Sequence, residues 1–97
     1  MWVESITFTP TGKNLKIKLK VVSPEPVRSA RVTLELERDG TLVSEFSGFT
    51  NSTGEVMYRL RRAANGEYLA TITMLTHSQY VWDKSKGVIL EGYMLNR

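Results

Sequence analysis

The chain has no cysteine among its 97 residues. Neither a disulfide bond nor a thiolate metal site can therefore form, and the fold must rest on its apolar core. Cysteine-free domains occur on both sides of a membrane, so this absence leaves the redox compartment open. There is also one histidine, His77, and with no second histidine or cysteine to join it a zinc site is excluded.

Long apolar runs are absent as well. No stretch approaches the ~20 apolar residues that a membrane-spanning helix needs, and the N-terminus lacks the basic and apolar regions of a signal peptide. We therefore expect no membrane span. If the domain is secreted, we expect the signal to belong to a larger precursor.

What is present is an ordinary globular composition, with 41% hydrophobic and 24% charged residues. Such a chain can bury enough apolar surface to offset its conformational entropy. A length of 97 residues suits one core and not two, so we expect a single domain over residues 1–97.

Short runs that alternate apolar and polar residues fill the chain, and no stretch has a helical period. In the clearest run, Leu15, Ile17 and Leu19 alternate with lysines, which predicts a strand with its aliphatic side chains buried. Asp39-Gly40 lies between two such runs and predicts a tight hairpin. The expected strands cover residues 2–9, 15–22, 30–37, 42–46, 56–61 and 68–73. After them the pattern weakens: 80–82 is short, and 88–95 forms a last strand interrupted by Gly92.

These elements predict an all-β fold, an immunoglobulin-like Greek-key sandwich of about seven antiparallel strands in two sheets. Four segments carry a further likeness: 30–34 (ARVTL), 49–56 (FTNSTGEV), 65–72 (NGEYLATI) and 80–83 (YVWD). With them the chain resembles the bacterial and archaeal immunoglobulin-like domains appended to secreted enzymes and surface proteins. The resemblance implies an accessory role on a protease, glycosidase or adhesin, with no catalytic residues to carry over. Asn51 stands where the family often has Asp, which does not favour a cation-stabilised loop.

A cationic patch is the first candidate binding site. If the second and fifth strands are neighbours, their outward cations lie together on one sheet: Lys16, Lys18, Lys20, Arg59 and Arg61. The outward positions of the other sheet are nearly balanced in charge. Such a patch would attract anionic polysaccharide, membrane headgroups, nucleic acid or a companion domain. The simpler interpretation is that the lysines keep the strand soluble and discourage edge pairing. Nucleic acid is not expected, because aromatic side chains do not interleave with the cations.

An aromatic platform is the second candidate site. Trp2, Tyr80 and Trp82, with Tyr93, could offer flat rings to a sugar. The competing interpretation is that a tryptophan near the last strands packs across the end of the sandwich.

Other chemistry is not indicated. No nucleophile motif or phosphate-binding glycine loop is present, and Glu35 and Glu37 are typical of solvated surface charge. We expect no enzyme activity and no cofactor. Asp39, Asn51 and Asp83 form no calcium-ligand series and are interpreted as turn residues. Residues 51–53 (Asn-Ser-Thr) match a glycosylation sequon, which a hydroxyl-rich turn explains equally well.

The sequence therefore predicts a non-catalytic accessory module of a larger extracellular or cell-surface protein, acting as spacer, stabiliser or docking surface. Its expected partners are other domains of the same protein, together with anionic polysaccharide or a cell-surface component. We expect the isolated domain to be a monomer. Two alternatives stay open: a carbohydrate-binding module, and an adhesin or pilus-type repeat in which a strand edge pairs with a partner.

Overall fold

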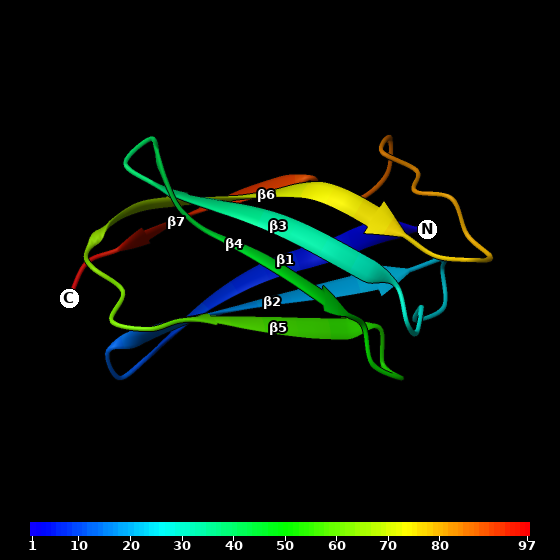
Figure 1. The fold of residues 1–97 in the computed structure, drawn as a ribbon, viewed down its shortest axis with the longest axis horizontal. Coiled ribbons are helices and arrows are strands. Elements are labelled where there is room, and N and C mark those ends of the chain that lie inside the picture. The colour runs from blue at the N-terminus through cyan, green and yellow to red at the C-terminus, as the bar shows by residue number, and fades with distance from the viewer.

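The computed structural model describes residues 1–97 as two antiparallel β-sheets packed face to face, which confirms the predicted sandwich (Figure 1). The strands are β1 (Trp2–Thr11), β2 (Asn14–Val22), β3 (Arg31–Arg38), β4 (Thr41–Phe49), β5 (Glu55–Leu60), β6 (Gly66–Thr76) and β7 (Leu90–Leu95). One sheet has the order β1-β2-β5 and the other the order β4-β3-β6-β7. No helix is long and apolar enough to span a membrane.

The core lies between the sheets and follows the predicted alternation. Leu15, Ile17 and Leu19 of β2 are fully buried, and Leu34 and Leu36 of β3 are buried in the same cluster. Burial of one such side chain contributes about 1.5–3 kcal/mol. The apolar half of each strand pattern therefore fixes which side chains remain on the outer surfaces.

Two aromatic pairs join the sheets along the two open sides of the sandwich. Phe46 of β4 lies over Tyr58 of β5 with ring centroids 5.1 Å apart, and Phe8 of β1 stacks on Tyr93 of β7 at 5.2 Å. The Tyr58 hydroxyl donates a hydrogen bond to the Val32 carbonyl of the opposite sheet at 2.9 Å. Burial raises the pKa of Tyr58 to about 12. Tyr58 thus links the layers by a buried polar contact as well as by packing.

Residues 80–82, where the sequence pattern is short and weak, form no strand and belong to the loop between β6 and β7. The loop instead covers the start of β1, where the Asp83 N–H donates to the Met1 carbonyl at 2.7 Å and the Val88 N–H to the Val3 carbonyl at 2.9 Å. Gly87 makes the close approach possible. Its φ is +69°, and a Cβ there would lie 2.0 Å from the Val3 carbonyl oxygen.

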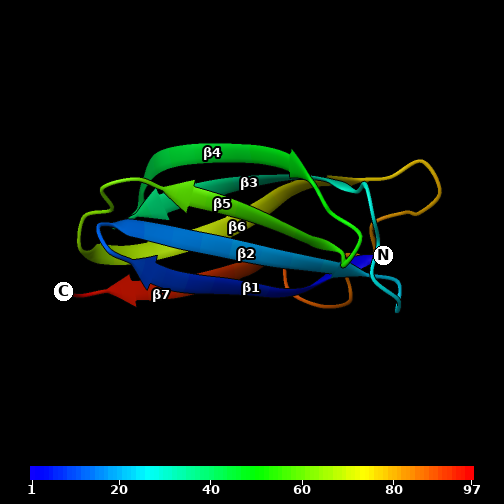
Figure 2. The same cartoon turned by 90° about the horizontal axis from the view of Figure 1, so that it is seen from below.

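Both ends of the sandwich are held by specific contacts. At one end the buried Thr50 hydroxyl donates to the Val27 carbonyl at 2.6 Å and accepts from the Ala30 N–H at 2.9 Å. At the other, the hydroxyl of the fully buried Tyr68 donates to the Ala64 carbonyl at 2.6 Å, the tyrosine corner that immunoglobulin-type sandwiches form at this place. The two chain ends lie at opposite ends of the molecule, whose longest dimension is 40 Å (Figures 1 and 2).

Candidate functional site

The outer surface of the three-stranded sheet is predominantly cationic, and Figure 2 looks onto it. The predicted adjacency of β2 and β5 is confirmed, with Lys16 paired to Arg59 and Lys20 to Glu55. The outward cations of this sheet are named the cationic face: Lys16, Lys18, Lys20 and Arg59. The carboxylates nearby are Glu55 and, at the bulge in β1, Glu4.

Arg61, the fifth cation of the predicted patch, lies outside the paired strands. It is exposed and follows Leu60, the last residue of β5. The next residue, Arg62, has a φ of +50° and donates its N–H to Asn14 Oδ1 at 3.2 Å. The turn therefore places Arg61 beyond the end of the cationic face.

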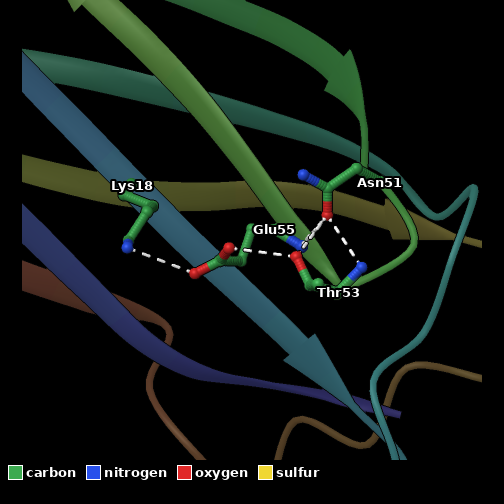
Figure 3. A network of polar contacts seen from close by, with 4 residues as sticks. All are labelled: Lys18, Asn51, Thr53 and Glu55. Carbon is green, nitrogen blue, oxygen red and sulfur yellow. Dashed lines mark hydrogen bonds and ion pairs between the residues drawn. The ribbon is translucent and has the colours of Figure 1, made fainter.

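A polar network fixes one end of the cationic face to the β4–β5 loop (Figure 3). Lys18 Nζ lies 3.2 Å from Glu55 Oε2, and the Thr53 hydroxyl lies 3.0 Å from Glu55 Oε1. Asn51 Oδ1 accepts the N–H groups of Thr53 and Glu55, both at 3.0 Å. The hydrogen bonds from Lys18 and Thr53 lower the pKa of Glu55. The contacts from the β4–β5 loop therefore hold the Glu55 carboxylate beside Lys18.

The remaining cations of the face have no such partner. Lys18–Glu55 is the one ion pair in the structure, so Lys16, Lys20 and Arg59 form no ion pair within the chain. Lys16 and Arg59 also stand directly opposite each other on paired strands, an arrangement that is unfavourable for like charges. Their charge is available to an external anion.

The outer surface of the four-stranded sheet has the opposite sign. Glu35 of β3 stands directly opposite Glu45 of β4, and Glu37 lies two residues farther along β3. We name the outward carboxylates of this sheet the acidic face: Glu35, Glu37, Glu45 and Glu67. A pocket of about 290 Å³ at its end is lined by Glu37, Glu67, Leu69 and Asp39, among others.

The sequence pattern did not reveal this acidic face, because it depends on a β-bulge. Counting back from the Asp39-Gly40 turn without a bulge would pair Glu35 with Ser44 and turn Glu45 inward. In the structure Ser44 pairs with Leu36, the register shifts at Val43, and Glu45 moves to the outer surface. The sequence predicted a nearly balanced charge on this sheet because Glu45 and Glu67 were not counted among its outward residues. With these two carboxylates the outer surface is acidic.

The predicted aromatic platform is divided among separate contacts. Trp82 is partly buried against the core and carries Lys84 Nζ 4.8 Å from its ring centroid, while Lys86 Nζ lies at the same distance over Trp2. The Trp82 indole Nε1 is buried and donates to no protein atom. Tyr80 is 42% exposed and packs edge-on against His77 at 5.0 Å. No aromatic contact joins these three rings to one another, and Tyr93 stacks on Phe8.

The remaining candidate residues have local structural roles. Asp39 Oδ1 accepts the Glu67 N–H at 2.9 Å, and Asp83 Oδ1 accepts the Ser85 N–H at 3.0 Å, which confirms their interpretation as turn residues. The Ser85 side chain and backbone lower the pKa of Asp83. His77 accepts the Gln79 N–H at Nδ1, so its Nε2 donates to the Arg28 carbonyl. No group of three or more His, Cys, Asp or Glu side chains is arranged to hold a metal ion.

Comparison with known proteins bears on the fold. The chain is similar to the crystal structure of the rat CD45 extracellular region, domains d3-d4, with a TM-score of 0.55 and 18% sequence identity. The match covers 97% of this chain and 48% of that one, so the chain spans about half the length of that structure. The domain is an immunoglobulin/fibronectin-like β-sandwich. No protein-family model and no curated protein sequence matches it.

Proposed function

We propose that this immunoglobulin/fibronectin-like domain is a non-catalytic module of a larger extracellular or cell-surface protein, where it acts as a spacer and docking surface. The observation that carries the proposal is the placement of the chain ends at opposite ends of a molecule 40 Å long. A chain that enters at one end and leaves at the other holds its neighbours apart. The likeness to part of the CD45 extracellular region supports the extracellular setting.

The contacts at the two ends support a stiff spacer. A spacer keeps its neighbours at a fixed distance only if its terminal loops are rigid. Here Thr50 joins two loops at one end, and Tyr68 holds the β5–β6 loop at the other. Both hydroxyls donate to backbone carbonyls at 2.6 Å. Buried polar contacts of this kind resist local opening because each lost partner leaves an unsatisfied group.

The spacer role is tested by single-molecule energy transfer. Because the chain has no cysteine, Ser78→Cys in the β6–β7 loop and Asn96→Cys after β7 label segments at opposite ends cleanly. Ser78→Cys with Ser52→Cys in the β4–β5 loop is the matched pair at one end. We expect one narrow population for the opposite-end pair, at a separation near the long dimension, that persists in urea until the domain unfolds cooperatively. A broad population, or one that shifts gradually before unfolding, would contradict the spacer role.

Recognition of an anionic polysaccharide is the second candidate function, and the unpaired Lys16, Lys20 and Arg59 favour it. We expect salt-sensitive retention on a sulfated dextran column that the double variant Lys16→Glu, Arg59→Glu loses. Arg28→Glu with Arg97→Glu is the control, since it changes the net charge equally at exposed positions outside the cationic face. Equal loss in both variants would show that only net charge matters.

A further inference from the structure

Each sheet carries a like-charge pair in direct cross-strand register, and the two pairs have opposite signs. Lys16 opposes Arg59 on the three-stranded sheet, and Glu35 opposes Glu45 on the four-stranded sheet. Like charges placed opposite each other destabilise a sheet. None of the four forms an ion pair within the chain, so the fold does not relieve either repulsion itself.

We propose that a second copy of this chain relieves both repulsions. The cationic face of one copy docks on the acidic face of the other, so that Lys16 and Arg59 meet Glu35 and Glu45. The proposal rests on the docking role proposed for this domain, which it assigns to the cationic and acidic faces with a second copy as the partner. Charge complementarity selects the second copy, because the two surfaces of one chain are opposite in sign and alike in the paired placement of their charges.

The two faces also match in the spacing of their charges, and both carry exposed apolar side chains. Side chains two residues apart on a strand lie about 6.8 Å apart, so the charges along β2 and β3 follow the same spacing. Met57, paired with Lys18, is 53% exposed on the cationic face. On the four-stranded sheet Leu42, paired with Glu37, is 55% exposed, and Leu90, paired with Thr71 on the edge strand β7, is 53% exposed. The lysine stems can cover these leucines while their ammonium groups reach the carboxylates.

The interface is heterologous, since it joins different surfaces of the two copies. A dimer therefore keeps one cationic face free on one copy and one acidic face free on the other, and association does not stop at two copies. Because exposed charges dominate the contact, salt screens it, and the monomer expected from the sequence is the state at low concentration or high salt.

Sedimentation equilibrium of the wild-type chain provides the test. In 20 mM NaCl we expect the weight-average mass to rise above 11.0 kDa as the concentration approaches 1 mM, and in 500 mM NaCl we expect it to return to 11.0 kDa. A wild-type chain that stays monomeric at 1 mM in low salt would overturn the proposal.

Charge reversal identifies the surfaces. Lys16→Glu with Arg59→Glu gives both faces an acidic cross-strand pair, and Glu35→Lys with Glu45→Lys gives both faces a basic one. The two pairs of one variant then repel each other across the interface, so we expect each variant alone to be monomeric. Their equimolar mixture regains complementary faces and should associate in 20 mM NaCl. Arg28→Glu with Arg97→Glu, which has the same net charge as the first variant, should associate like the wild type.

A mixture that stays monomeric, or association that survives in either variant alone, would contradict the proposed interface. Urea unfolding of each variant checks that the fold is intact. Failure here is distinguishable from failure of the proposed function. The energy-transfer experiment is done on dilute molecules and does not depend on association, and retention on sulfated dextran tests the cationic face without a second copy.

Discussion

Replacing Tyr58 with Phe tests whether the two sheets are joined as the structure shows. The Tyr58 hydroxyl donates to the Val32 carbonyl at 2.9 Å in the buried layer between β5 and β3. Such a hydrogen bond contributes about 1 kcal/mol net to the free energy of unfolding. At pH 8 we therefore expect Tyr58→Phe to be less stable than the wild type by about that amount.

At alkaline pH the difference should disappear. Burial raises the pKa of Tyr58 in the folded chain to about 12, against an ordinary value of 10.0. As the pH rises above 10 the unfolded chain loses the phenol proton that the folded chain keeps, so the stability from the protonated phenol declines. At pH 11 the decline amounts to about 1.4 kcal/mol. Tyr58→Phe has no phenol to ionise and is spared this loss.

Urea unfolding followed by circular dichroism at pH 8 and pH 11 measures both quantities. The free-energy gap between wild type and Tyr58→Phe, about 1 kcal/mol at pH 8, should close by pH 11 and reverse slightly, because the decline of about 1.4 kcal/mol exceeds it. Tyr80→Phe, which removes a phenol from an exposed loop, is the control for the substitution itself. A gap that stays constant between the two pH values would show that Tyr58 is not buried between the sheets.

Three further outcomes are expected. Gly87→Ala should destabilise the domain by at least about 1–3 kcal/mol in urea, because its Cβ would collide with the Val3 carbonyl at 2.0 Å; wild-type stability would refute the loop position. Tyr68→Phe should cost about 1 kcal/mol by removing the bond to the Ala64 carbonyl, and an unchanged urea midpoint would count against this contact. In Lys18→Met the pKa of Glu55 should rise toward its ordinary value in an NMR titration; no change would place the two side chains apart.

The sequence was sufficient for the features that depend on neighbouring residues alone. The alternation of Leu15, Ile17 and Leu19 with lysines predicted which side of β2 is buried, and the structure agrees. The Asp39-Gly40 turn adopts the positive φ values expected of a tight hairpin, 52° and 84°. Local pattern and turn chemistry are properties of a few consecutive residues, so they can be interpreted without the fold.

Features that depend on distant segments were not predictable in this way. The outward position of Glu45 follows from a bulge at Val43, which breaks the two-residue period on which the prediction relied. Trp82 lies in a loop because Val81, Asp83 and Val88 bond to Met1 and Val3 at the start of β1, and no local signal marks that pairing. Arg61 falls outside the cationic face because β5 ends one residue earlier.

Cross-strand nuclear Overhauser effects between backbone protons give the most direct test of two outer faces with opposite charge. The structure predicts effects that join Lys16 to Arg59 and Glu35 to Glu45. A register shifted by one residue on β4, with Glu35 joined to Ser44, would turn Glu45 into the core and remove the complementary surface.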